Sequence, residues 1–408
     1  MDAGHILEQC RSSSSRVIEW RRMLHRIPET GLECPKTEAA IQSVLDQLGV
    51  RIQEDYSGPG VVALVEGELP HSGAVALRAD IDALPIEEAE GREYGSGHPG
   101  RMHACGHDAH AAIALGAADF LSRNRKHLPG MVKFIFQPAE ETVNGAQRMV
   151  EAGALENPRA DCLLGLHVGN IWPEVGLGQV GVCYKPMMAA ADMFEFRMRS
   201  GGGHGAAPHT SGDPVLAAAR AITGLHSIIS RNIDPLDPAV ITVGRISGGT
   251  ACNIIPTEVS AEGTVRTLDD STRDTLETRI GDVVAHSAAS FGCTHEFTYL
   301  RASSRVENDH GMVDLVRKAA VDLLSPDGVH VIERPSLTGE DVSVFLDKVP
   351  GCFFALGTSN PSKGRVSLHH SPVFDIEESV LFHGVAVFCL SALRFLEQQG
   401  AGLAKQQI

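Results

Sequence analysis

The chain has 408 residues, of which 43% are hydrophobic and 21% are charged. This length suggests two or three domains, and the composition is that of a globular protein that buries a large core without disulfides. Lys and Arg number 35 and Asp and Glu number 51, so the formal net charge is −16. Such an acidic balance disfavours nucleic acid or an anionic membrane as the main partner.

The N-terminal residues carry no apolar stretch behind a basic start, and no run of about 18 or more uncharged apolar residues occurs. We therefore expect neither a secretory signal nor a membrane span. The nine Cys residues are scattered and form no Cys-x-x-Cys pair. This distribution disfavours a disulfide framework and a thiol-redox motif, so a reducing cytoplasm is the predicted location.

Helices alternate with short apolar strands in the first part of the chain. The expected helices cover 36–48, 111–121 and 146–153, and the expected strands cover 61–67, 74–80, 131–137 and 162–168. Strands that read as nearly continuous apolar runs are buried on both faces. We therefore expect a mostly parallel sheet with helices on both faces.

The pattern changes between residues 188 and 302. The elements expected there are strand 191–200, helix 214–229, strands 239–248 and 259–268, helix 271–291 and strand 294–300. The order β-α-β-β-α-β is that of a ferredoxin-like unit. The pattern of the first part of the chain then resumes, with helices near 309–324 and 340–347 and an apolar strand at 352–357. The predicted fold is α/β, with a catalytic domain in two segments, 1–187 and 303–408, and a smaller α+β domain, 188–302, inserted between them.

The strongest motif is MHACGHDAH, which contains His103, Cys105, His107, Asp108 and His110. Between Cys105 and His107 stands only Gly106, which lets the backbone bend so that both side chains face one ion. A thiolate with an imidazole suits zinc, manganese or another borderline divalent ion. Asp108 could instead be the N-cap of the following helix, but that role explains neither the Cys nor the His residues.

Further polar residues stand where predicted strands end: Asp80 and Asp82, Glu140 and Glu141, and His167. Open parallel sheets place their active sites at the carboxyl ends of strands. Late in the chain, His369 and His370 adjoin a turn bounded by proline. Singly, such residues are more often solvated glutamates or core histidines, but together they predict a metal centre.

Two divalent ions about 3.5–4 Å apart can share a water molecule and clamp the oxygens of a substrate. Such a centre needs several ligands and one carboxylate that stays off the metal and accepts a proton. Glu140 and Glu141 could fill these two roles, one as a ligand and one as the proton acceptor, because neighbours in an irregular segment can point in different directions.

Seven motifs, HACGHDAH, FQPAEE, GLHV, GGHGAAPH, CNIIP, GTVRT and LHHSP, resemble in this order the aminoacylase and carboxypeptidase family of dinuclear metallohydrolases. In particular they resemble its branch of hippurate hydrolases, N-acyl-amino-acid amidohydrolases and indole-acetyl-amino-acid hydrolases. The resemblance covers nearly the whole chain. It implies two zinc or manganese ions in the catalytic domain, and an inserted lid or dimerisation domain that would make a homodimer or a dimer-based oligomer.

By motif match, the resemblance implies five metal ligands, Cys105, His107, Glu141, His167 and His370, with Glu140 as the general base. His370 matches better than His369 because it lies two residues before Pro372. Asp82 would orient His107 from behind the metal.

In the inserted domain the resemblance implies three substrate-side residues, His204, Asn253 and Arg266. His204 would polarise the scissile carbonyl, Asn253 would contact the substrate, and Arg266 would bind a carboxylate. Alternatively, His204 could lie in a solvated turn, Asn253 could simply shape a turn, and Arg266 could be structural. The segment 337–346 lacks the aromatic residue that often follows the Glu-Asp pair in this branch, and 137–146 is less rich in Gly than usual.

The sequence therefore predicts an amidohydrolase that cleaves the amide of N-acyl or aryl-acyl amino acids, with a metal-activated water and Glu140 as the base. A dipeptidase or exopeptidase on the same site is the first alternative. A non-catalytic metal- or ligand-binding protein is the second, but it would not need a base beside a full ligand set. A thiol-redox role for Cys105 is disfavoured, because no resolving Cys lies near it in sequence.

Overall fold

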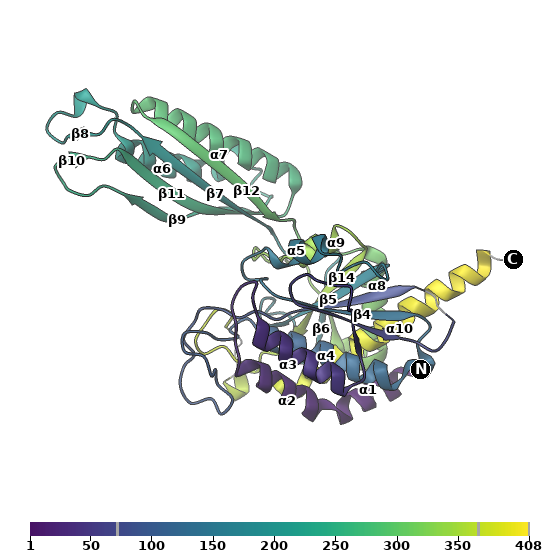
Figure 1. Ribbon diagram of the computed structural model, residues 1–408. Coiled ribbons are helices and arrows are strands. Elements are labelled where there is room, and N and C mark those ends of the chain that lie inside the picture. The colour runs from purple at the N-terminus through teal and green to yellow at the C-terminus, as the bar shows by residue number, and fades with distance from the viewer. Residues whose placement is uncertain (71–72, 365–367, 407–408) are drawn as a thin grey trace. The chain divides into compact units, whose positions relative to one another are not determined.

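The computed structural model describes residues 1–70, 73–364 and 368–406 and divides into two compact units (Figure 1). The larger unit comprises Met1–Met187, Val306–Pro335 and Asp341–Ile408. The smaller unit comprises Met188–Arg305 and Ser336–Glu340. It thus runs beyond residue 302, the predicted end of the insertion, and includes a short later segment.

The larger unit is built on an eight-stranded sheet with the order β1-β2-β4-β3-β5-β14-β6-β13. Its strands are β1 (Arg51–Ile52), β2 (Val61–Glu66), β3 (Ala74–Asp80), β4 (Met131–Gln137), β5 (Cys162–Gly169), β6 (Val180–Val182), β13 (Val329–Val331) and β14 (Gly351–Gly357). The central strands β4, β3, β5 and β14 pair in parallel. Antiparallel pairing joins β2 to β1 and β4, and β14 to β6. The expected parallel sheet is therefore confirmed at the centre, within a sheet that is mixed toward its edges.

Helices cover both faces of this sheet. They are α1 (Ala3–Ser12), α2 (Ser14–His25), α3 (Pro35–Gln47), α4 (His107–Arg123), α5 (Gly145–Glu151), α8 (His310–Leu324), α9 (Val342–Leu346) and α10 (Leu381–Gln406). Helices α5 and α9 contact each other on one face, and α4 and α10 lie together on the other (Figure 1). Alternate residues of β3 follow this division, since Val75, Leu77 and Ala79 join the hydrophobic core on the α4 side, whereas the equally buried Ala74 and Ala76 do not. Arg78 is unusual in this strand, because it carries a charge although every residue of β3 is buried.

The segment Glu378–Gly400, most of which belongs to α10, is long and apolar enough to cross a membrane by length and composition alone. Within the larger unit, however, 78% of its most apolar window is buried. Helix α10 contacts α1, α4 and α8. Burial on this scale is that of a core helix in a globular unit.

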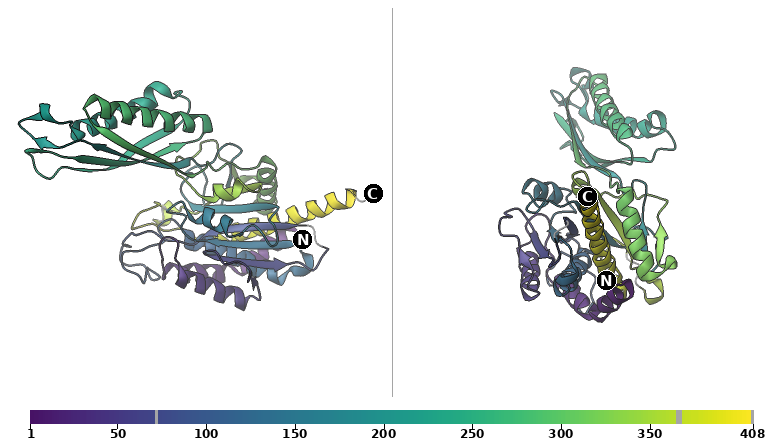
Figure 2. Two further views of the ribbon diagram at one scale, coloured as in Figure 1. Left: turned by 45° about the horizontal axis from the view of Figure 1, so that its top comes forward. Right: turned by 90° about the vertical axis from the view of Figure 1, so that its right-hand side faces the viewer.

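The smaller unit contains a four-stranded antiparallel sheet with the order β12-β7-β11-β9. Its elements are β7 (Ala190–Arg199), β8 (Gly203–His204), α6 (Pro214–Asn232), β9 (Ala239–Gly248), β10 (Ile254–Ile255), β11 (Glu258–Thr267), α7 (Asp270–Ser290) and β12 (Thr294–Ser303). Helices α6 and α7 lie against one face of the sheet (Figure 2). Along β7 the buried residues Phe194, Phe196 and Met198 alternate with more exposed ones, as in a sheet that is covered on one face.

Candidate metal centre

Three adjacent parallel strands of the larger unit bring polar residues to one edge of the sheet. Asp82 follows β3, Glu140 and Glu141 follow β4, and His167 lies near the end of β5. Because β4, β3 and β5 are neighbours, their carboxyl ends meet. The start of helix α4 adds His107 as its first residue and Cys105 from the preceding turn.

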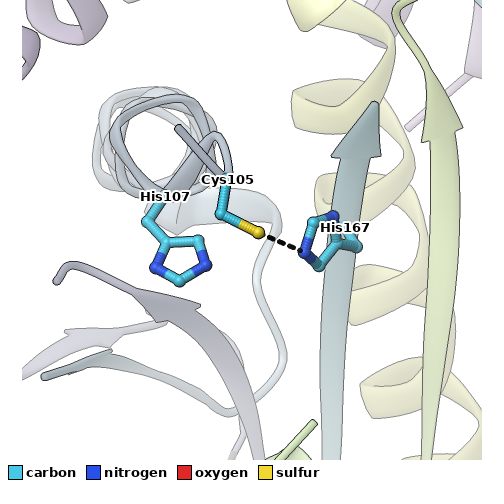
Figure 3. Close-up of side chains that lie close together, drawn as sticks. All are labelled: Cys105, His107 and His167. Atoms are coloured by element: carbon cyan, nitrogen blue, oxygen red, sulfur yellow. Dashed lines mark hydrogen bonds between the residues drawn. The ribbon is translucent and has the colours of Figure 1, made fainter. Parts of the chain in front are cut away.

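Cys105, His107 and His167 form one group of possible ligands (Figure 3). Their ligand atoms all lie within 4.8 Å of one another, and Cys105 Sγ is 3.6 Å from His167 Nε2. Gly106 makes this turn possible, because its φ of 91° lies in the left-handed region. A Cβ at Gly106 would also stand 2.6 Å from the side chain of Val168. The short spacing therefore works only with glycine between the two side chains.

A second group, Cys105, Glu141 and His370, shares Cys105 with the first. His370 Nε2 lies 3.3 Å from Glu141 Oε2. The neighbouring His369 is engaged differently, since its Nε2 accepts a hydrogen bond from the Asn170 N–H at 3.1 Å. Its Nδ1 must then carry the proton and point it at Cys105 Sγ, 3.6 Å away. The geometry thus directs His370, rather than His369, to Glu141.

Asp82 connects three of these segments. Its Oδ1 accepts the N–H of Glu140 at 3.1 Å, and its Oδ2 accepts the N–H of Glu141 at 3.2 Å. Its backbone carbonyl accepts a hydrogen bond from His107 Nδ1 at 2.9 Å. This last bond leaves His107 Nε2 facing the two glutamates.

Two buried atoms of the site have no hydrogen-bond partner among the described residues, His107 Nε2 and Glu141 Oε1, which lie 4.0 Å apart. A buried polar atom without a partner is costly, and one cation between the two would satisfy both. Burial also raises the pKa of the Cys105 thiol, so its ionisation at neutral pH needs a nearby cation. Thiolate, imidazole and carboxylate donors together fit a borderline divalent ion.

The charges around the site also favour a cation. Burial by itself lowers the pKa of His107, but the carboxylates of Asp80 and Asp82 outweigh it and hold that pKa above its ordinary value. Cys105 and Glu141 raise the pKa of His370 to about 10. Both imidazoles therefore sit in a negative potential, which would attract a metal ion in place of the extra protons.

The other residues of the MHACGHDAH motif have supporting contacts. His110 Nδ1 donates to Asp80 Oδ1 at 2.5 Å, and its Nε2 accepts the N–H of Val168 at 2.9 Å. Both ring nitrogens of His110 are therefore engaged in hydrogen bonds. His103 belongs to no group of possible ligands, and burial lowers its pKa to about 3.

Asp108 is not the N-cap of α4, which corrects that alternative. Gly106 occupies the N-cap position, and Asp108 Oδ2 instead accepts hydrogen bonds from Arg21 Nε at 3.0 Å and His25 Nδ1 at 2.7 Å. Arg21 and His25 were not recognised in the sequence, and neither were Arg78 and Asp341. A charged residue inside an apolar strand, as at Arg78, is a signal that could have been used, because such a residue needs buried partners.

The smaller unit brings two of its three candidate residues together. Strand β8 pairs with β10, so that His204 faces Ile254, and the Gly205 N–H donates to the carbonyl of Asn253 at 2.8 Å. His204 and Asn253 are both exposed. Arg266 lies near the far end of β11, roughly 27 Å along the strand from its first residue, Glu258. Burial lowers the pKa of this guanidinium, which makes no ion pair within the described part of the chain.

The chain matches the family model of peptidase family M20/M25/M40 over residues 76–394. It is 39% identical to an N-acetyl-L-cysteine deacetylase of Bacillus subtilis over 386 residues, 94% of this chain and 88% of the relative. It is 36% identical to the IAA-amino acid hydrolase ILR1-like 4 of Arabidopsis thaliana over 380 residues, 92% and 84% of the two chains. The solved structure of the YXEP protein of Bacillus subtilis, a dinuclear metal binding peptidase from the M20 family, superposes with a TM-score of 0.79 at 32% identity and covers 95% of this chain and 99% of that one.

These similarities confirm the resemblance that the motifs indicated. The two groups of possible ligands that contain Cys105 and the dinuclear relative together support two metal ions in the larger unit. The chain therefore belongs to peptidase family M20/M25/M40 and is a metal-dependent hydrolase of amide bonds.

Proposed function

We propose that the protein hydrolyses N-acyl or aryl-acyl amino acids to a carboxylic acid and a free amino acid. The observation that carries this proposal is the different setting of two adjacent glutamates. Both glutamates lie near His107 Nε2, but only Glu141 is also grouped with Cys105 and His370, with its Oε2 3.3 Å from His370 Nε2. Relatives named for deacetylation of N-acetyl-L-cysteine and for hydrolysis of IAA-amino acids support the choice of substrate class.

The proposed metal ligands are Cys105, His107, Glu141, His167 and His370. Two zinc or manganese ions bound there would polarise the amide carbonyl and lower the pKa of a water molecule. Glu140 accepts a proton from the attacking water at a carboxylate oxygen and donates it to the leaving amine nitrogen. The carboxylate of Asp82 keeps Glu140 in place by accepting a hydrogen bond from the backbone N–H of Glu140.

The substrate-side roles belong to the smaller unit. Arg266, a half-buried guanidinium, suits the free carboxylate of an amino acid. His204, beside Asn253, polarises the carbonyl. Because Arg266 lies near the far end of β11 from His204, one small substrate would take these two groups from different subunits, and we assign the smaller unit to dimerisation. All nine cysteines are free thiols, which is consistent with a cytoplasmic enzyme.

A dipeptidase or exopeptidase is the alternative, since the dinuclear relative is named as a peptidase. The two functions differ in whether the substrate needs a free α-amino group. We expect the enzyme reconstituted with zinc or manganese to hydrolyse N-acetyl and N-benzoyl amino acids at least about tenfold faster, in kcat/KM, than dipeptides with the same C-terminal residue. Release of the amino acid is the measurement, and metal-free enzyme is the control. Faster cleavage of the dipeptides would select the alternative.

Glu140→Gln should keep both metal ions and lose roughly 10²–10⁴-fold in kcat, because an amide oxygen is a poor proton acceptor. Glu141→Gln is the matched comparison, and it should lose metal as well as rate. Metal content by atomic absorption and steady-state kinetics separate the two variants. Near-native turnover of Glu140→Gln at equal metal content would exclude Glu140 as the base.

Cys105→Ala should lower metal occupancy together with activity, because it removes a donor common to both ligand groups. Cys162→Ala is the control, since Cys162 is a buried cysteine of β5 that belongs to neither group. It should reduce the melting temperature but leave the metal content unchanged. A fully metallated and active Cys105→Ala enzyme would make Cys105 a structural cysteine.

His204→Ala should reduce turnover strongly without changing the metal content, because the imidazole polarises the carbonyl and binds no metal. If His204 serves a neighbouring subunit, mixing His204→Ala with Glu140→Gln enzyme should restore part of the activity. A mixed dimer would then pair one intact imidazole with one intact metal site. The absence of recovery after verified subunit exchange would exclude this arrangement.

A further inference from the structure

Glu140 and Glu141 lie in a closed loop, 138–144, between the end of β4 and the start of α5. The two ends of the loop meet, since the Gly145 N–H donates to the carbonyl of Ala139 at 3.3 Å. A Cβ at Gly145 would stand 1.7 Å from the carbonyl oxygen of Pro138, so only glycine permits this approach.

The backbone of this loop is strained. Ala139 and Val143 have φ values of 60° and 53°, in the left-handed region that residues with a Cβ rarely adopt. Each such residue is energetically unfavourable and persists only where its surroundings hold it. The loop that carries Glu140 therefore depends on contacts that keep its ends together.

Asp341 makes such contacts at both ends. Its Oδ1 accepts a hydrogen bond from the side-chain amide of Gln137, the last residue of β4, at 2.6 Å. Its Oδ2 accepts the N–H of Ala146, in the first turn of α5, at 3.0 Å. Asp341 is only 1% exposed, so these bonds are shielded from competing water.

Arg78 orients this carboxylate. Its Nη2 donates to Asp341 Oδ1 at 3.2 Å, and its Nε donates to the side-chain carbonyl of Gln137 at 2.8 Å. Its Nη1 donates to Asp80 Oδ2 at 2.9 Å, behind His110. Carboxylate oxygens of Asp341 and Glu140 lie within 4.8 Å of each other, and the charge of Arg78 offsets the repulsion between them.

We propose that Asp341 is a positioning residue for amide hydrolysis, which holds the loop 138–144 closed so that Glu140 faces the reacting water. This inference rests on the proposed role of Glu140 as the base. Asp341 acts through Gln137 and Ala146 and takes no part in proton transfer. A displacement of about 1 Å at a reacting group can cost about 10²-fold in rate, so a modest opening of the loop would be visible in kcat.

Asp341→Asn tests the proposal. Its side-chain NH₂ group would face either the donors of Gln137 and Arg78 or the N–H of Ala146, so the contact at one end of the loop would be lost. We expect kcat to fall about 10²-fold while KM stays within about threefold, because the substrate-binding groups are elsewhere. Asp119→Asn is the matched control, since Asp119 is equally buried and pairs with Arg16 and Arg123. It should lower the melting temperature but leave kcat unchanged. Unchanged kcat in folded Asp341→Asn would overturn the proposal.

A second substitution should rescue the first. In the double variant Asp341→Asn with Gln137→Glu, the carboxylate at 137 can accept from Arg78 and from the new amide, while the amide oxygen at 341 accepts the N–H of Ala146. The net charge of the pair is unchanged. Recovery of at least about tenfold in kcat is expected, and a double variant no faster than Asp341→Asn would contradict the proposal. If Asp341→Asn does not fold, Gln137→Met keeps the Asp341 carboxylate but removes its contact at the β4 end, together with the acceptor of Arg78 Nε, and should still lower kcat.

The combination of Asp341→Asn with Glu140→Gln separates this inference from the function on which it rests. Asp341→Asn should cost little further rate in the Glu140→Gln enzyme, because the group that it positions is already disabled. An inactive Glu140→Gln with a normal Asp341→Asn would refute the positioning role alone. An active Glu140→Gln would refute the base itself.

Discussion

The carboxylate of Asp82 accepts the N–H groups of two successive residues, Glu140 and Glu141, while the carbonyl of the same residue accepts from His107. The proposed base Glu140 and the proposed ligands Glu141 and His107 are thus all hydrogen-bonded to one residue, which follows the end of β3. This is possible because β3 lies between β4 and β5 in the sheet and ends at the same edge. The spacing of the whole centre depends on that convergence.

Buried charge pairs, rather than apolar packing, support the centre from behind. Arg78 bonds to Asp80 and Asp341, and Arg21 bonds to Asp108 and Glu378, and both guanidinium groups are fully buried. Such pairs add little net stability, but they are directional and strongly destabilising when one partner is removed. They hold the backbone on either side of the ligands in one geometry, which interchangeable apolar contacts would do less well.

The sequence predicted the parts of this protein that local patterns determine. Continuous apolar runs predicted the central parallel strands, and alternation predicted the half-buried strand β7, because burial on one or two faces is visible in a few residues. The antiparallel pairings of β2 and β14 were not predictable, since they depend on partners far away in the chain. The same holds for Asp341 and Arg78, and for Asp108, where a distant arginine decides between a cap and an ion pair. The separation of Arg266 from His204 likewise follows from strand register rather than from motif order.

Strand β14 lies between β5 and β6 in the finished sheet, although the whole smaller unit separates it from them in the chain. During synthesis the smaller unit, which has its own core, is therefore complete before this central strand leaves the ribosome. Until then β5 presents an unpaired apolar edge, and an edge of that kind is prone to pair with other chains. The nascent protein is consequently exposed to aggregation for longest while the insertion is being made, and the proposed ligand His370 is synthesised only after β14.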